Sequence, residues 1–433
     1  MADEKNWIRE AMFYHIYPLG FTGAPLRNEG EATAGGRILE VLDWIEHFKE
    51  LGINAIYFGP IFESVSHGYD TTDYYQTDSR LGSKEDFKKV FTALHENGIR
   101  VIVDGVFNHV GRKFFAFLDV QKNLEQSDYK DWFCNLNFSW QSPLGDSFSY
   151  ENWHGAAELV KLNLRNPAVC EYLLGAVGMW MDELGIDGLR LDAADCVDRE
   201  FFKRLHSFTK GKREDFWLMG EIIHGDYRVW ANDEMLDSVT NYECWKGIYS
   251  SHNDKNYFEI AYSLKRQFGQ GGLYENLCLY NFLDNHDVNR IGSLLKQREN
   301  LKNAYTLLYM MPGIPSIYYG SEWGIEGVKG QGMDADLPLR PKLDLEEMCA
   351  QETDLPAHIR ELAKIRKESD AVKYGAYDEV LVRNKQFVFA RRSGEQYKVI
   401  ALNLTDHAET LHFSYQGKEY EVLLEAYTSK IME

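Results

Sequence analysis

The sequence predicts an α/β protein: a (β/α)8 TIM barrel with an insertion subdomain in one βα loop and a C-terminal antiparallel β domain. Short apolar segments alternate with amphipathic segments along most of the chain. The apolar segments carry no polar face, as is typical of strands in a parallel sheet that is covered on both sides. At least seven strand–helix units can be counted, which suits a closed eight-stranded barrel better than an open sheet. After about residue 370 the pattern changes to alternating strands separated by turns.

The expected barrel elements follow one another in chain order. Amphipathic spacing predicts the helices, and two of them are closed by Gly52 and Gly98, which are natural C-caps. Pro167 stands near the start of a third helix, where its missing N–H is harmless. The expected strands cover residues 11–21, 53–62, 99–109, 186–195, 215–223, 276–287 and 313–320, and the expected helices cover 37–52, 84–98, 167–185, 199–210 and 297–310.

Two segments interrupt this alternation and divide the chain into domains. Residues 110–159 are aromatic and irregular, and a long insertion in a βα loop usually shapes a substrate site. Residues 370–433 predict a C-terminal domain resembling a β-sandwich. The barrel is therefore expected to cover residues 1–109 and 160–369.

The charge balance and the cysteines exclude several classes of partner. The 433 residues include 47 Lys and Arg against 67 Asp and Glu, a net charge of −20. Such an acidic surface repels phosphate groups, which argues against nucleic acids and anionic membranes as partners. The absence of a long apolar run and of an apolar signal core predicts a cytoplasmic protein. Six cysteines without a CxxC pair predict free thiols and no zinc site.

Arg190 and Asp192 are unusual residues for an apolar strand. Because residues two apart share a face of a strand, both charges lie on one side of "GLRLDAAD" (188–195). Burial of a charge is costly unless it is paired, which leaves either a structural ion pair or a functional site. Other expected strand ends are also polar, and the C-terminal strand ends of a barrel meet at one mouth. The side chains that we expect to gather there are Asp104, Asn108, His109, Glu221, His286 and Asp287.

Four of these strand ends resemble the ordered sequence signatures of the α-amylase superfamily of glycoside hydrolases. They are "DGVFNH" (104–109), "GLRLDAAD" (188–195), "GEIIH" (220–224) and "FLDNHD" (282–287). The stretches "GYDTTDYY" (68–75), "LVKLNLRNP" (159–167) and "GIPSIYYGSEWG" (313–324) fit the same family. "GPIFESVSHGYDTTDYY" and "SVTNYECWKGI" are similar to its neopullulanase and cyclomaltodextrinase branch. The chain starts almost at the first barrel strand, so we expect it to lack the N-terminal β domain of many such relatives.

The resemblance implies a retaining mechanism with two carboxyl groups in different protonation states. Asp192 would be the nucleophile, and Glu221 the general acid and then the general base. Asp287 would bind sugar hydroxyls and stabilise the transition state; it could also cap the helix that follows. Arg190 would hold Asp192 ionised, since a neighbouring cation lowers the pKa of a carboxyl group.

The resemblance also implies a substrate-binding set around these carboxyl groups. His109 and His286 would donate hydrogen bonds to the sugar, although either could be an ordinary strand-end histidine. Tyr69 would stack on the sugar ring, and Asp70 and Asp104 would support the polar network. Weaker candidates are His224 and Tyr242 on the acceptor side and Trp140, Trp153 and Trp245 as sugar platforms.

Calcium is the one metal that the family resemblance brings into question. Many members follow the nucleophile with a Lys–His pair, and here those positions are Asp195 and Cys196. Asn108 matches another usual calcium ligand. We therefore expect no required metal or cofactor, with Ca²⁺ possible at Asn108.

The expected function is hydrolysis of α-1,4-glucosidic bonds in maltodextrins or related α-glucan oligosaccharides. Three alternatives stay open: transfer by a 4-α-glucanotransferase, α-glucosidase or neopullulanase activity, and a non-catalytic α-glucan-binding relative. The three acidic residues argue against the last of these. The sequence does not indicate an oligomeric state.

Overall fold

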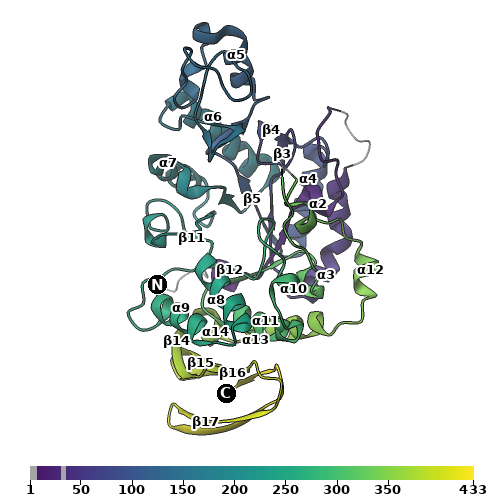
Figure 1. Cartoon of the computed structure of the whole chain (residues 1–433), viewed down its shortest axis with the longest axis vertical. Coiled ribbons are helices and arrows are strands. Elements are labelled where there is room, and N and C mark those ends of the chain that lie inside the picture. Colours follow the sequence, from purple (N-terminus) through teal and green to yellow (C-terminus); the bar gives the residue numbers. More distant parts are fainter. Residues whose placement is uncertain (1–6, 31–35, 333) are drawn as a thin grey trace.

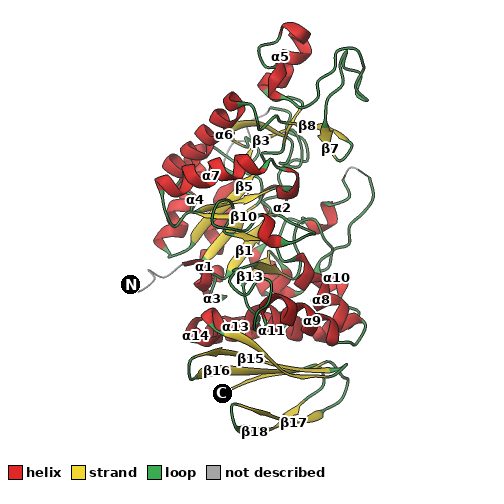
Figure 2. Cartoon of the chain, turned by 90° about the vertical axis from the view of Figure 1, so that its left-hand side faces the viewer, coloured by secondary structure: helices red, strands yellow, loops and turns green. Residues whose placement is uncertain are grey.

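The computed structural model describes residues 7–30, 36–332 and 334–433. A ring of parallel strands surrounded by helices lies at its centre, as Figures 1 and 2 show. The strand order is β11-β10-β9-β5-β2-β1-β13-β12, and every pairing between these strands is parallel. A single bridge between Thr240 and Tyr280 joins the two outer strands. The predicted (β/α)8 barrel is therefore confirmed.

The barrel strands are short and buried on both faces, as their apolar sequences predict. They are β1 (Phe13–Ile16), β2 (Ala55–Phe58), β5 (Arg100–Gly105), β9 (Gly188–Leu191), β10 (Trp217–Gly220), β11 (Ser238–Val239), β12 (Tyr280–Phe282) and β13 (Ile314–Tyr318). The expected strand at 11–21 ends early, because Pro18 begins a short helix, α2 (Pro18–Phe21).

Helices cover the outside of the ring. Ser83 and Asp86 form a capping box at the start of α4, and the left-handed Gly98 (φ 73°) ends the turn after it. The expected helix at 37–52 is instead a 3-10 helix, Arg37–Trp44, followed by a short α-helix. The N–H of Ile38 donates a hydrogen bond to the carbonyl of Leu81 and so joins this segment to the loop before α4. The helices are α1 (Trp7–Glu10), α3 (Ile45–Glu50), α4 (Lys84–Glu96), α6 (Pro167–Met179), α7 (Arg199–Lys212), α8 (Tyr242–Asn253), α9 (Phe258–Phe268), α10 (Ile291–Leu294), α11 (Leu301–Met310), α12 (Leu345–Cys349), α13 (Leu355–Glu368) and α14 (Asp370–Tyr374).

The segment that follows β5 projects from one end of the barrel, at the top of Figure 1. It contains a small antiparallel sheet of order β6-β8-β7, one α-helix and two short 3-10 helices, Leu124–Gln126 and Lys130–Trp132. Its elements are β6 (His109–Gly111), α5 (Phe115–Asn123), β7 (Asn152–Trp153) and β8 (Ala156–Lys161). The hairpin of β3 (Phe62–Ser64) and β4 (Thr71–Thr77) contacts β6 and α6.

Two antiparallel sheets form the C-terminal part of the chain, at the bottom of Figures 1 and 2. The first has the order β14-β15-β16-β19 and the second is the pair β17-β18. The side chains of Val388, Val399 and Leu411 belong to the apolar cluster between them. The strands are β14 (Ala376–Val382), β15 (Gln386–Ser393), β16 (Gln396–Asn403), β17 (Glu409–Tyr415), β18 (Lys418–Leu424) and β19 (Ser429–Met432).

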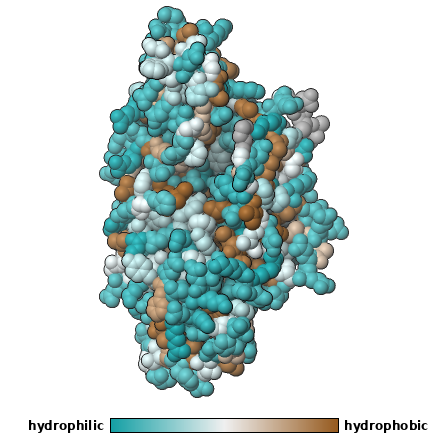
Figure 3. All heavy atoms as spheres, viewed as in Figure 1, coloured by the Kyte–Doolittle hydropathy of each residue, from teal (hydrophilic) through white to brown (hydrophobic). Residues whose placement is uncertain are grey.

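The surface and the cysteines agree with the composition. Hydrophilic side chains cover most of the face seen in Figure 3. All six cysteines are free thiols. Among the described residues, the structure contains no helix that is both long and apolar enough to cross a membrane.

Candidate active site

Arg190 joins carboxyl groups from three neighbouring strands. Its Nη1 lies 2.9 Å from Oδ1 of Asp104, within β5, and 2.9 Å from Oδ1 of Asp192, directly after β9. Its Nη2 lies 2.9 Å from Oε1 of Glu221, directly after β10. All three acids lie toward the C-terminal ends of their strands, where active sites of such barrels form. The charged face of the strand "GLRL" is thus explained by one buried cation with three partners.

The carboxyl group of Glu221 is oriented by the turn that follows Asp192. Its Oε2 accepts a hydrogen bond of 3.1 Å from the backbone N–H of Ala193. Ala193 has a left-handed backbone (φ 43°), which is unfavourable for a residue with a Cβ. The hydroxyl of Tyr242 approaches Oε1 of Glu221 at 3.5 Å. The N–H of Ala193, the hydroxyl of Tyr242 and the guanidinium of Arg190 therefore orient the carboxyl group of Glu221.

A second group of residues surrounds Asp104. The hydroxyl of Tyr57 donates to Asp104 at 3.0 Å, and that of Tyr69 donates to Oδ2 at 3.1 Å. The same Tyr69 hydroxyl lies in close contact with Nε2 of His286. The rings of Tyr69 and His286 are nearly parallel, at 11°, with centroids 5.5 Å apart. Tyr69 therefore links the loop before β4 to the loop after β12.

Asp287 is held from both sides. Nε2 of His286 lies 3.0 Å from its Oδ2, and Nη2 of Arg340 lies 3.0 Å from its Oδ1. Arg340 also donates to the backbone carbonyl of His286 at 3.0 Å and lies over the ring of Tyr17. Our reading of the sequence missed Arg340. It stands 53 positions after Asp287, outside the motifs and inside no predicted element, so only the folding of the loop reveals its role.

Comparison with known proteins agrees with this arrangement. Residues 15–361 match the model of the alpha amylase catalytic domain family. The chain belongs to the alpha-amylase family. Family relatives include a cyclomaltodextrinase of a Bacillus species, 31% identical over 428 residues, which are 94% of this chain and 74% of that protein. An intracellular maltogenic amylase of Bacillus subtilis is 31% identical over 386 residues, which are 85% of this chain and 63% of that protein.

A solved structure within the family resembles the whole fold. The cyclic alpha-maltosyl-(1→6)-maltose hydrolase from Arthrobacter globiformis, in complex with maltose, superposes with a TM-score of 0.86. The sequence identity is 26%, and the match covers 99% of each chain. The predicted membership of the neopullulanase and cyclomaltodextrinase branch of the alpha-amylase family is confirmed by the relatives.

Burial and charge divide the acids of this family site into two kinds. Burial raises the pKa of Asp192 to about 7 and that of Asp104 to about 6, against the opposing charge of Arg190. Burial also raises the pKa of Glu221. Arg190 lowers the pKa of Asp192, as expected, but burial is the larger effect and leaves that pKa above its ordinary value.

Asp287 differs from the other three acids. Burial raises its pKa, but the charge of His286, the hydrogen bond from His286 and the charges of Arg340 and Arg190 together outweigh that effect. The pKa of Asp287 consequently lies below its ordinary value, and its carboxylate stays charged at neutral pH. The pKa of His286 is itself lowered by burial, so Arg340 and Arg190 are the permanent charges beside Asp287.

His109 and Asn108 form a buried pair after β5. Burial lowers the pKa of His109 to about 3, so its ring is neutral near pH 7. Asn108 Nδ2 lies 3.2 Å from Nδ1 of His109, while Nε2 of His109 has no hydrogen-bond partner among the described residues. The ring centroid of Trp153 is 5.9 Å from that of His109. A free ring nitrogen on a buried neutral imidazole can hydrogen-bond a substrate hydroxyl.

Asp70 and the tryptophan candidates occupy different places from the carboxyl cluster. Both carboxylate oxygens of Asp70 accept hydrogen bonds from Ser66, at 3.1 and 2.7 Å, which closes the loop that carries Tyr69. Asp70 therefore supports Tyr69 through the backbone. Trp140 is 69% exposed in the insertion, whereas Trp245 lines a groove beside Tyr242.

The residues around Asn108 do not build a calcium site of the usual kind. The Oδ1 atom of Asn108 is buried without a hydrogen-bond partner among the described residues, so one oxygen atom is free to act as a metal ligand. Calcium takes six to eight oxygen ligands, usually including carboxylates. Within the described ranges no three His, Cys, Asp or Glu side chains gather where they could hold a metal ion. One amide oxygen does not fit that requirement, and no step below involves a metal.

Proposed function

We propose that this alpha-amylase-family protein is a retaining glycoside hydrolase that cleaves α-1,4-glucosidic bonds in maltodextrins or related oligosaccharides. The observation that carries the proposal is the shared contact of Arg190 with Asp192 and Glu221. Two buried carboxyl groups thereby lie beside one cation, and the charge of Asp287 raises the pKa of both. Retaining hydrolysis requires two such groups, one to attack and one to donate a proton.

In the first step, Glu221 donates its proton to the glycosidic oxygen while Asp192 attacks the anomeric carbon. The bond from that carbon to the leaving sugar breaks as the bond to a carboxylate oxygen of Asp192 forms. In the second step, Glu221 accepts a proton from water, and the resulting hydroxide displaces Asp192. The nucleophile is regenerated, Glu221 is reprotonated, and the sugar keeps its anomeric configuration.

The remaining residues act on the sugar ring that becomes positively charged. Asp287 remains ionised because Arg340 and His286 hold it, so it can accept hydrogen bonds from sugar hydroxyls and stabilise that charge. Tyr69 would pack against the ring and His109 would hydrogen-bond a hydroxyl. Asp104 acts on Arg190 and Tyr69 and is a positioning residue.

The relatives support short or cyclic maltodextrins as the substrate class, since one is named a cyclomaltodextrinase and another a maltogenic amylase. The relative named intracellular supports a cytoplasmic location. We propose that no metal is required. EDTA is then expected to leave the rate of maltodextrin cleavage unchanged, and a large loss reversed by calcium would contradict this.

Product analysis tests the proposed function. Pure protein is incubated separately with maltoheptaose, pullulan and β-cyclodextrin, and the products are separated by chromatography. Shorter maltodextrins from maltoheptaose support hydrolysis of α-1,4 bonds. Products longer than maltoheptaose identify a 4-α-glucanotransferase. Cleavage confined to the α-1,6 bonds of pullulan identifies a hydrolase specific for α-1,6 bonds. No product from any of the three supports a non-catalytic binding protein.

A further inference from the structure

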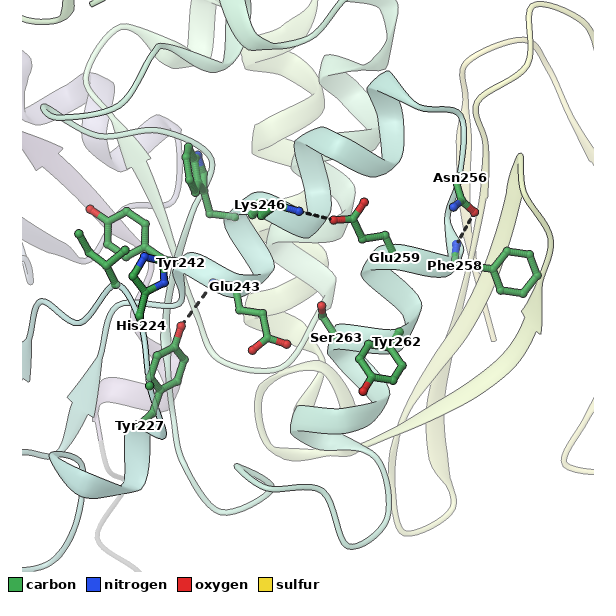
Figure 4. A pocket seen from close by; sticks show the side chains of 13 residues that line it. His224, Tyr227, Tyr242, Glu243, Lys246, Asn256, Phe258, Glu259, Tyr262 and Ser263 are labelled. Carbon is green, nitrogen blue, oxygen red and sulfur yellow. Dashed lines mark hydrogen bonds and ion pairs between the residues drawn. The ribbon is translucent and has the colours of Figure 1, made fainter.

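A groove of about 630 Å³ runs along α8 and α9 and reaches Tyr242, whose hydroxyl lies 3.5 Å from Oε1 of Glu221. Its near wall is formed by Ile223 and His224, two and three residues after Glu221 in the chain, and by Tyr242. Its far wall is formed by Phe258 and Tyr262 on α9. Figure 4 shows this span, with Tyr242 and His224 on one side and Tyr262 on the other. The volume lies in the range of about 300–1,000 Å³ that is typical of ligand pockets.

The charged side chains of the groove are already paired with one another or with neighbours. Nζ of Lys246 on α8 lies 2.7 Å from Oε1 of Glu259 on α9. Glu243 is bound by the guanidinium of Arg266, with one contact at 3.2 Å. Since neither carboxylate is left free, the groove suits a neutral ligand better than an ionic one.

The aromatic side chains of the groove suit a ligand with flat apolar faces and polar edges. Tyr262 is 67% exposed and Phe258 is 50% exposed, which is unusual for large rings on a helix that also has a buried face. The ring nitrogen of Trp245 is buried and, among the described residues, has no hydrogen-bond partner. A sugar ring offers an apolar C–H face to such rings and hydroxyl acceptors to such donors.

The position of the groove relative to Glu221 decides which part of the substrate it meets. Glu221 protonates the oxygen that stays with the leaving group, so the leaving sugars begin beside Glu221. None of the residues that surround the ring under attack, namely Tyr69, His109, His286 and Asp287, lines the groove. A chain that continues past the first leaving sugar therefore meets the surface of α8 and α9.

We propose that this groove binds the leaving-group part of a longer α-glucan chain, with Tyr262 as the stacking platform farthest from the reacting bond. The inference rests on the proposed function and adds a preference for substrates that extend several sugar units beyond the cleaved bond. The groove thereby makes the cleavage rate depend on chain length.

The test compares substrates with long and short leaving groups. For each enzyme, kcat/KM is measured with maltoheptaose and with p-nitrophenyl α-maltoside, whose single aromatic leaving ring does not extend to α9. Tyr262→Ala is expected to lower the ratio of the two values about tenfold, by loss of one stacking contact. Tyr262→Phe keeps the ring and is expected to retain the wild-type ratio. Leu423→Ala removes an exposed apolar side chain of the C-terminal sheet and is the matched surface control.

A binding measurement supplies an independent readout. In an Asp192→Asn background, which cannot turn over, the Kd of maltoheptaose is measured by calorimetry with and without Tyr262→Ala. Weaker binding in the double variant supports the inference.

The two proposals fail in different ways. If Tyr262→Ala changes neither the ratio nor the Kd, or changes only the oligomeric state seen in sedimentation, the groove proposal is wrong while wild-type hydrolysis stands. If the wild-type protein cleaves neither substrate, the proposed function itself is wrong.

Discussion

Arg190 contacts three buried acids, and its charge lowers the pKa of each of them against the larger effect of burial. The nucleophile must be ionised and the general acid must be protonated, so the acidic limb of activity follows the ionisation of Asp192, whose pKa burial raises to about 7, and the basic limb follows that of Glu221, whose pKa burial also raises. Because these groups interact, the two limbs of the pH profile belong to the cluster as a whole. We expect a bell-shaped dependence of kcat/KM on pH.

Replacement of Asp104 by Asn tests this coupling. The negative charge of Asp104 raises the pKa of Asp192, and it competes for Nη1 of Arg190. Asp104→Asn is therefore expected to lower the pKa of Asp192 and move the acidic limb of kcat/KM to lower pH, with a smaller shift of the basic limb. The measurement is a kcat/KM profile from pH 4 to 10 on a maltodextrin. An acidic limb that stays in place or moves to higher pH contradicts the assigned coupling.

The nucleophile is also predicted to cost stability. The pKa of Asp192 is higher in the folded chain than in the unfolded one, so its contribution to stability is complete below its unfolded pKa and is lost as pH rises through about 7. Asp192→Asn is expected to raise the Tm by about 1–3 °C at pH 8 and to change it little at pH 4. Turnover is expected to fall about 10⁴-fold.

Calorimetry at the two pH values, with a rate assay, checks that prediction. Asp195→Asn is a suitable control, because Asp195 lies three residues later and forms no bond to Arg190 in the described ion pairs. A variant of Asp192 that retains most of its turnover is incompatible with the proposed nucleophile. If Asp192→Asn lowers the Tm at pH 8, the argument about stability is wrong, while the assignment of Asp192 as the nucleophile still stands.

At the scale of the elements, the strand β6 fixes the loop that carries Tyr69. A Cβ added to Gly111 of β6 would lie only 2.3 Å from the carbonyl oxygen of Asp70 and 2.9 Å from its carbonyl carbon. Backbone atoms cannot move aside as a flexible side chain can. The loop that contains Asp70 must therefore shift if Gly111 gains a side chain. Tyr69 directly precedes Asp70 in that loop, so it would shift as well.

Gly111→Ala is consequently expected to lower kcat/KM on a maltodextrin by about tenfold or more, since small displacements of positioning groups cost large factors in rate. Gly211→Ala is the matched control, because a Cβ there meets no atom within 4 Å in helix α7. It is expected to keep full activity and to gain about 0.5–1 kcal/mol in the free energy of unfolding. Equal activity of Gly111→Ala and Gly211→Ala would contradict the claim that β6 positions Tyr69.

Most helices and strands could be predicted from sequence patterns. Apolar runs and closing glycines located most barrel strands and helices, because strands buried on both faces have a simple composition. The strand predicted at 11–21 was too long because Pro18 begins a helix. The segment predicted as one helix at 37–52 is a 3-10 helix over Arg37–Trp44 followed by a short α-helix. No helix was predicted at α8 or α9, although they form the groove.

The site divides in the same way. Asp192, Glu221 and Asp287 could be singled out because each stands beside a strand end in a recognisable motif. The contacts of Arg340, the closure of the Tyr69 loop by Asp70 and the sharing of Arg190 depend on separate segments meeting in space. The rise in the pKa of Asp192 depends on burial, which no single segment reveals.

At the scale of the whole molecule, the barrel and the C-terminal sheets share one core. Phe387, Phe389 and Leu402 belong to the same apolar cluster as the barrel residues. Nη1 of Arg391 donates to the carbonyl of Met310 at the end of α11, at 3.0 Å, and Asn303 donates to the carbonyl of Asn403 at 2.9 Å. A continuous core and buried polar contacts make independent unfolding of either part costly.

We therefore expect one cooperative unfolding transition in differential scanning calorimetry, with calorimetric and van't Hoff enthalpies that agree. All ten tryptophans precede residue 376, so their fluorescence reports on the remainder of the chain without the C-terminal sheets. The fluorescence midpoint is expected to coincide with the calorimetric one. Two separate endotherms, or a fluorescence midpoint that differs from the main one, would show that the two parts unfold independently.

The guanidinium shared by the attacking and the proton-donating side chains has a consequence for engineering. A substitution that alters this cation disturbs both halves of the reaction at once, so selection for work in acid or alkali cannot adjust one half through Arg190 alone. Tyr242 touches Glu221 and makes no contact of this kind with Asp192. Directed evolution of the pH range of activity would accordingly select substitutions at Tyr242 and its neighbours, which change the surroundings of Glu221 and leave those of Asp192 unchanged.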